Sequence, residues 1–132
     1  MRELTFETQR RTQLLDMTAQ VSQAVAGADG TAVTLFVPHT TAGIVLQAAG
    51  EGAGLVAADV EAAFERIVAE DVAWRHTVEG DRNPWSHVRA ALTASSVTIP
   101  LRDGELVLGE RQSVFLAEFD GPRTRKLYVT VL

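Results

Sequence analysis

The sequence predicts an α+β fold, a single domain over residues 1–132 with a β-sandwich core flanked by helices. Short stretches in which apolar and polar residues alternate recur along the chain, as in half-buried strands. Other stretches place apolar residues three or four positions apart, as on one face of a helix. The last third consists of strand patterns alone, around the strong hairpin signal Asp103-Gly104.

The elements of the first half alternate between strand and helix. Residues 4–6 predict a first strand and residues 13–15 a second extended piece. Thr18 is the expected N-cap of a helix whose apolar face includes residues 21–25. Residues 33–37 alternate as a strand that ends at Pro38, because proline has no N–H for a sheet ladder.

The middle of the chain contains the clearest helix pattern. Residues 44–46 predict a buried strand, and glycines follow within residues 50–54. These glycines match neither a P-loop nor a dinucleotide-binding loop. Apolar residues about four positions apart then form one helical face over residues 56–67.

Polar residues and strands make up the rest. Residues 71–86 are expected to be mostly irregular, with a short strand at residues 74–76. Asn83 is the expected cap, and Pro84 the first residue, of a helix that reaches Leu92. Strands follow at residues 97–99, 106–108, 114–119 and 127–132, and the last two are expected to pair across Asp120-Gly121-Pro122.

Composition limits the classes of partner. The chain has 12 Lys and Arg against 17 Asp and Glu, a net charge of −5, which argues against nucleic acid. It has no cysteine, so disulfides, thiolate nucleophiles and cysteine-bound zinc are excluded. The N-terminus has no signal-peptide pattern, and no apolar run reaches transmembrane length. We therefore expect a cytoplasmic protein without a membrane partner.

The three histidines, His39, His76 and His87, are the main candidates for chemistry. Each lies at or beside the end of an expected element, where functional groups are often displayed. Three imidazoles with an open fourth position would suit a catalytic zinc. Their spacing matches no compact metal motif, so the alternative is three separate histidines that are half-exposed or hydrogen-bonded in the core.

Several polar residues could contact an anion. Thr40 and Thr41 follow directly on His39, and Ser95 is a similar hydroxyl. Arg123 and Arg125 follow a tight turn, and either could hold a phosphate through two parallel hydrogen bonds. The alternative interpretations are β-forming residues at strand ends and a solvated turn.

The segment FVPHTTAGIVL, residues 36–46, resembles the YjbQ-like family, whose members carry the label secondary thiamine-phosphate synthase. Further similar segments lie at residues 16–18, 74–76, 86–87, 94–101, 106–109 and 118–123. The resemblance implies a β-sandwich flanked by helices, assembled as a homotrimer. It also implies that His39, His76 and His87 converge in a cleft associated with a metal ion or a bound anion.

The chain departs from the family pattern in two places. Gln47-Ala48-Ala49 stands where the family usually shows Asn-Glu-Asn, and Glu51 follows shortly after. Residues 109–113 keep Gln112, a further expected anion-binding residue, but lack the family's tryptophan. Both changes would alter a pocket wall or an acid/base group.

Three functions follow as hypotheses. The first is a metal-dependent enzyme, either a thiamine-phosphate synthase-like transferase or a phosphoryl or hydrolytic enzyme. Its three histidines would bind zinc, or magnesium with a pyrophosphate substrate. The second is a trimeric protein that binds a metal or a small phosphorylated molecule without turnover. The third is a purely structural protein with scattered histidines.

A carboxylate near the histidines would distinguish the first two functions. Glu51, Asp59, Glu118 and Asp120 are the candidates. A carboxylate within reach of the histidines would favour catalysis through proton transfer, and its absence would favour binding.

Overall fold

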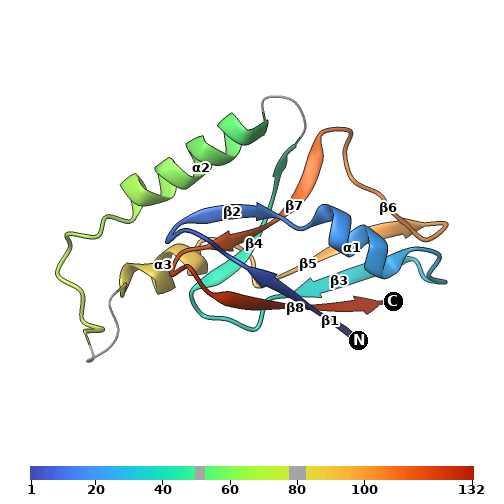
Figure 1. The fold of residues 1–132 in the computed structure, drawn as a ribbon, viewed down its shortest axis with the longest axis horizontal. Coiled ribbons are helices and arrows are strands. Elements are labelled where there is room, and N and C mark those ends of the chain that lie inside the picture. Colours follow the sequence, from blue (N-terminus) through green and yellow to red (C-terminus); the bar gives the residue numbers. More distant parts are fainter. Residues whose placement is uncertain (50–52, 78–82) are drawn as a thin grey trace.

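The computed structural model describes residues 1–49, 53–77 and 83–132. Figure 1 shows its helices and strands, which are labelled in chain order. They are β1 (Arg2–Glu7), β2 (Gln13–Asp16), α1 (Thr18–Val25), β3 (Ala32–Phe36), β4 (Ala42–Ala48), α2 (Ala53–Ile67), α3 (Trp85–Ala91), β5 (Ser96–Arg102), β6 (Glu105–Leu106), β7 (Gln112–Glu118) and β8 (Thr124–Val131).

Two antiparallel sheets form the centre of the fold. The larger has the strand order β1-β8-β3-β5-β6 and the smaller the order β2-β7-β4. The apolar faces of the two sheets meet in the main core, which α1 closes with Val21 and Val25. The predicted α+β sandwich flanked by helices is therefore confirmed.

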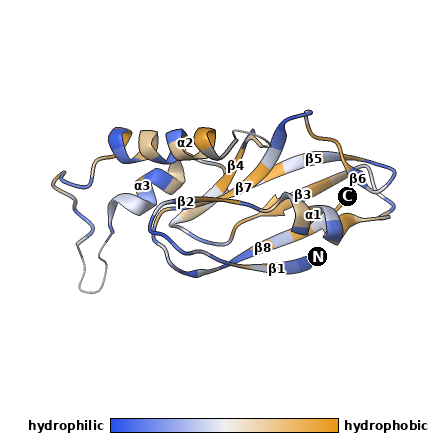
Figure 2. Cartoon of the chain, turned by 45° about the horizontal axis from the view of Figure 1, so that its top comes forward, coloured by the Kyte–Doolittle hydropathy of each residue, from blue (hydrophilic) through white to orange (hydrophobic). Residues whose placement is uncertain are grey.

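The smaller sheet is buried on both faces. Its second face carries Phe115 and Phe119, which pack against apolar side chains of α2, including Phe64. Because both faces are covered, residues 113–118 of β7 are all buried. Figure 2 shows hydrophobic colour concentrated on β4 and β7.

The predicted pairing of the last two strands is wrong. β7 pairs with β2 and β4, whereas β8 pairs with β1 and β3. The turn at residues 119–123 therefore crosses from one sheet to the other instead of closing a hairpin. Gly121 lies tightly in this turn, where an added Cβ would come within 2.1 Å of the Arg10 carbonyl oxygen.

The other hairpin prediction is confirmed. Asp103 and Gly104 both have positive φ, 52° and 76°, and join β5 to β6. This is the backbone of a two-residue hairpin turn, which favours Asp-Gly. β6 is shorter than expected and ends at Leu106.

Three local predictions differ from the structure. Residues 74–76 form no strand, in keeping with their exposed neighbours Ala73 and Thr77. Met17, not Thr18, is the N-cap of α1, because the Thr18 hydroxyl instead accepts a hydrogen bond from the Val114 N–H. The N-cap of α3 is Pro84, one residue later than expected. Among the described residues, no helix is long and apolar enough to span a membrane.

Candidate functional site

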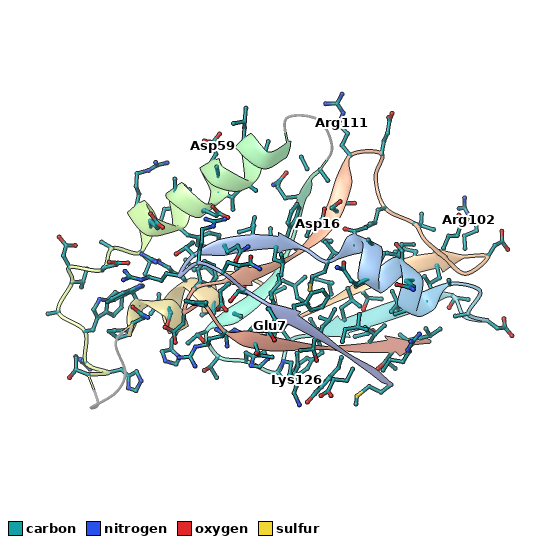
Figure 3. All side chains as sticks on the ribbon, viewed as in Figure 1. Glu7, Asp16, Asp59, Arg102, Arg111 and Lys126 are labelled. Carbon is teal, nitrogen blue, oxygen red and sulfur yellow. The ribbon has the colours of Figure 1, made fainter. Side chains whose placement is uncertain are left out.

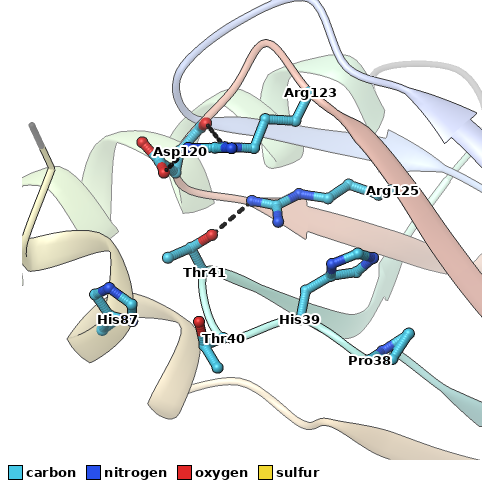
Figure 4. A pocket seen from close by; sticks show the side chains of 8 residues that line it. All are labelled: Pro38, His39, Thr40, Thr41, His87, Asp120, Arg123 and Arg125. Carbon is cyan, nitrogen blue, oxygen red and sulfur yellow. Dashed lines mark hydrogen bonds and ion pairs between the residues drawn. The ribbon is translucent and has the colours of Figure 1, made fainter. Parts of the chain in front are cut away.

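One pocket collects most of the residues that the sequence singled out. It has a volume of about 510 Å³ and lies between the β3–β4 loop, the turn after β7 and helix α3 (Figure 4). Its lining consists of Pro38, His39, Thr40, Thr41, His87, Asp120, Arg123 and Arg125.

A buried ion pair forms the floor of the pocket. Arg125 lies on the inward-facing side of β8, the same side as Leu127 and Val129. Glu118 is the last residue of β7. The Arg125 Nε donates to the two carboxylate oxygens of Glu118 at 2.9 and 3.1 Å, and Nη2 also donates to this carboxylate. Both side chains are at most 5% exposed, so the pair is shielded from water.

Further hydrogen bonds satisfy the Glu118 carboxylate. It accepts the Thr8 hydroxyl at 2.8 Å and the backbone N–H groups of Phe119 and Asp120 at 3.1 and 3.2 Å. This many donors offset the desolvation cost of burying the carboxylate beside its arginine. The network therefore fixes the orientation of Arg125.

Arg125 keeps one donor nitrogen for the pocket. Its Nη2 also donates to the Thr41 hydroxyl at 2.7 Å. Its Nη1 makes no hydrogen bond to any residue that the structure describes. Figure 4 shows this nitrogen directed toward the space between Thr41 and His39.

A second, more exposed pair stands at the rim. The Arg123 Nη2 donates to the Asp120 Oδ2 at 2.7 Å and Nε to the Asp120 carbonyl oxygen at 2.8 Å. The other carboxylate oxygen of Asp120 accepts from Asn83, which precedes α3. Asp120 thus connects the turn after β7 to the start of the helix that carries His87.

His39 accepts a backbone hydrogen bond. The N–H of Lys126 donates to its Nε2 at 2.8 Å, so a neutral His39 carries its proton on Nδ1 and can donate there. Burial, followed by the charge of Arg125, lowers the pKa of His39, and the nearby Glu118 opposes this only in part. His39 is therefore a neutral donor near pH 7.

The two other histidines meet each other. The ring centroids of His76 and His87 lie 5.1 Å apart in an edge-to-face arrangement. His87 lines the pocket, and His76 joins the site through this contact. The structure thus brings all three histidines to one end of the molecule.

This arrangement does not fit a site in which three imidazoles hold one metal. The Nε2 lone pair of His39 is already used by Lys126, and Nδ1 of that tautomer carries the proton. The described residues contain no group of three His, Asp or Glu side chains arranged to hold a metal ion. Binding of zinc or magnesium stays a prediction.

The remaining predicted residues have separate places. Ser95 follows α3, and its carbonyl oxygen accepts the Val37 N–H. Gln112 begins β7 and lines a different pocket with Leu46 and Arg111, at the opposite end of the strand from Glu118 (Figure 3). Neither belongs to the lining of the histidine pocket.

The candidate carboxylates also separate. Asp120 lines the pocket and Glu118 binds Arg125 beneath it. Asp59 lies on the exposed side of α2 (Figure 3), and Glu51 lies outside the described residues. The chain therefore supplies the carboxylate that the catalytic hypothesis requires, in Asp120.

The sequence indicated Arg125 only as a possible phosphate ligand after a tight turn, and the structure buries it beneath the pocket. Its burial also has a sequence signal, because this arginine faces the same side of its strand as the buried Leu127 and Val129. An inward-facing charge of this kind needs a partner and often marks a functional site.

Comparison with known proteins places the chain in a family. A sequence model of the family described as UPF0047 protein YjbQ-like matches residues 2–132. The chain belongs to this family. It is 36% identical over 130 residues to a UPF0047 protein of Archaeoglobus fulgidus, which covers 98% of this chain and 99% of that protein. It is 28% identical over 136 residues to the UPF0047 protein YugU of Bacillus subtilis, covering 100% and 98%.

Solved structures of YjbQ-like proteins agree with the fold. A protein of the YjbQ/UPF0047 family from Clostridium acetobutylicum has a TM-score of 0.89 at 33% identity, with both chains covered completely. A hypothetical protein from Aeropyrum pernix K1 has a TM-score of 0.90 at 28% identity, covering 99% of this chain and 96% of that one. The names of these relatives state no reaction, so thiamine-phosphate synthase activity stays a prediction.

Proposed function

We propose that the histidine pocket binds the phosphate group of a small phosphorylated molecule and that the protein is an enzyme acting on this ligand. The observation that carries the proposal is the fixed Arg125, which Glu118 and Thr41 hold with Nη1 toward the pocket. A donor that is already oriented binds an anion without a further ordering cost.

Three other groups support phosphate binding. Arg123 is about half exposed at the rim, and its guanidinium can turn from Asp120 to an incoming phosphate. Thr40 and His39 also line the pocket. The Thr40 hydroxyl and the His39 Nδ1–H are neutral hydrogen-bond donors. Together they supply charged and neutral donors, which suits a phosphate.

Catalysis requires a group that moves a proton. We assign this role to His87, which lines the pocket and whose ring lies against His76. Asp120 is the carboxylate that lines the same pocket and can assist transfer or hold an N–H of the ligand. The specific reaction expected from the family resemblance joins a pyrimidine pyrophosphate to a thiazole phosphate, and both reactants carry the group that the pocket recognises.

Binding and turnover are tested separately. Isothermal titration with inorganic phosphate and pyrophosphate is expected to show binding that Arg123→Ala weakens and Arg102→Ala, a change at the exposed β5–β6 hairpin, leaves unchanged. No binding of either anion by the parent protein would refute the proposal.

Turnover is tested on a panel that includes the pyrimidine pyrophosphate with the thiazole phosphate. Release of phosphate or pyrophosphate that is lost in His87→Gln, with anion binding kept, would establish the enzyme. Binding without release from any substrate would favour the non-catalytic alternative. Metal analysis of the untagged protein tests zinc in the same preparation.

The expected homotrimer and the cytoplasmic location belong to the same proposal. Phe36 on β3 and Tyr128 on β8 stack with ring centroids 6.3 Å apart, and Phe36 remains 42% exposed. A partly exposed aromatic pair on a sheet suits the centre of a subunit contact. Light scattering is expected to give three times the mass of the chain, and Phe36→Ser to reduce it.

A further inference from the structure

A second buried arginine lies two residues beyond His87 on α3. Arg89 is 0% exposed, and it borders a pocket separate from the histidine pocket. Burial lowers the pKa of its guanidinium, which shows that the surroundings resist the charge. A charge kept in such a place needs compensating contacts.

The contacts of Arg89 lead to the end of α2. Its Nε and Nη2 donate to the carbonyl oxygen of Val68 at 3.1 and 2.8 Å. Val68 directly follows α2, and its own N–H donates to Phe64 in the last turn of that helix. Carbonyl groups at a helix C-terminus carry partial negative charge, which favours a cation there.

Glu70 completes the contact. Its Oε1 lies 3.9 Å from the Arg89 Nη1, which has no hydrogen bond within the described part of the chain. The same oxygen accepts from Arg11 at 2.9 Å. Residues 68–70 are thus held to α3 by the two buried hydrogen bonds from Arg89 to Val68. They are also held to the β1–β2 loop by the exposed ion pair between Glu70 and Arg11.

This tie has a consequence for the histidines. His76 lies six residues beyond Glu70, on exposed and irregular chain, and yet its ring packs edge-to-face on His87. Arg89 and His87 are on the same short helix. The hydrogen bonds from Arg89 to Val68 and the contact between the two histidine rings therefore both join the chain after α2 to α3.

We infer that Arg89 is a positioning residue, which fixes the chain after α2 against α3 so that His76 meets His87 at the pocket. The inference rests on the proposed function only in taking these two histidines as part of the site. Arg89 touches no reacting group and acts through the position of His76.

The test compares Arg89→Met, Arg89→Lys and Val21→Ala. Val21 is fully buried in α1, away from α3, so its truncation controls for a general loss of stability. The first readout is the nuclear Overhauser cross-peak between the His76 and His87 rings, which does not depend on any ligand. The second is the affinity for inorganic phosphate.

We expect the cross-peak to be lost in Arg89→Met, weakened in Arg89→Lys, which can still donate one hydrogen bond to Val68, and unchanged in Val21→Ala. Phosphate affinity is expected to stay at the parent value in Arg89→Met, because the proposed phosphate donors Arg123 and Arg125 lie on other elements. A folded Arg89→Met with the parent cross-peak would overturn the inference.

Should Arg89→Met not fold, the lysine variant decides. A cross-peak weaker than in the parent supports the inference, and one of equal intensity refutes it. If the parent binds no phosphate, the proposed function fails while the cross-peak still tests Arg89.

Discussion

The middle and the end of β7 lie in contrasting surroundings. Val114 and Leu116, in the middle, are 0% exposed between the two sheets, and their side chains pack in the main apolar core. Glu118, at the end, is equally buried but faces an arginine and hydroxyl groups. Apolar burial needs no particular partner, whereas a buried carboxylate needs specific donors. The comparison teaches that one strand serves stability along most of its length and holds a binding group at its last residue.

The largest effect should come from breaking the polar end. Glu118→Ala leaves Arg125 buried without its partner, which costs about 3–5 kcal/mol of the free energy of unfolding. Urea denaturation followed by circular dichroism measures the loss. A decrease below about 1 kcal/mol would mean that the pair behaves as a surface salt bridge.

A double variant sharpens this result. Replacing both charges, Glu118→Leu with Arg125→Met, removes the unpaired charge and should recover much of the lost stability. Phosphate binding should be lost in the double variant, because Arg125 supplies the fixed donor. Recovery of both properties would contradict the role proposed for Arg125.

Breaking the apolar middle should cost slightly less and leave the site intact. Leu116→Ala opens a cavity between the sheets and is expected to lower the free energy of unfolding by about 3 kcal/mol. Titration with phosphate at a temperature where the variant is folded should give the parent affinity. A large loss of affinity would show that the two regions are coupled.

Arg123→Ala should have the opposite effect to Leu116→Ala, because it should weaken phosphate binding and leave stability almost unchanged. Arg123 is about half exposed, so its salt bridge with Asp120 contributes little to stability and unfolding should change by less than about 0.5 kcal/mol. Phosphate binding should weaken about tenfold, since a charge-assisted hydrogen bond is worth about 1.5 kcal/mol. Arg123→Lys, which keeps the charge without the two parallel donors, should fall between parent and alanine.

The smallest effect concerns pH. Burial, and next the charge of Arg125, lower the pKa of His39 relative to the unfolded chain. The unfolded chain therefore binds this proton more readily, so the stabilising contribution is complete above the ordinary histidine pKa and is lost as the pH falls through the lowered value. Urea midpoints measured between about pH 8 and about pH 5 should decline less in His39→Gln than in the parent. Equal declines would exclude His39 as the cause.

The sequence predicted those parts of the fold that depend on local pattern. Alternation located the strands, and Asp103-Gly104 located the hairpin, because both signals arise within a few residues. The partner of β7 could not be found in this way, since a turn of given length permits either a hairpin or a crossing between sheets. The expected strand at residues 74–76 is absent for a related reason, because Trp74 makes a local contact instead and donates its indole N–H to the Glu70 carbonyl oxygen at 3.2 Å.

The site was predicted in part for similar reasons. His39, Thr40, Thr41 and Arg123 lie in segments that resemble the family, and the structure gathers them around one pocket. Resemblance alone could not show that Lys126 donates to His39, since that contact joins positions 87 residues apart. Ser95 and Gln112 belong to the same similar segments but lie elsewhere, because neighbouring positions in a motif need not face the same space.

The central position of β7 determines how long the pocket floor persists when other parts of the protein open. Its backbone is paired on both sides, to β2 and β4, and both of its faces are covered. Amide protons in such a strand exchange with solvent only when the whole domain opens, whereas the exposed last turn of α2, residues 65–67, can open locally. Glu118 is the last residue of this strand, so the pocket floor should survive the local openings that expose other parts of the molecule, and its amide should be among the slowest to exchange.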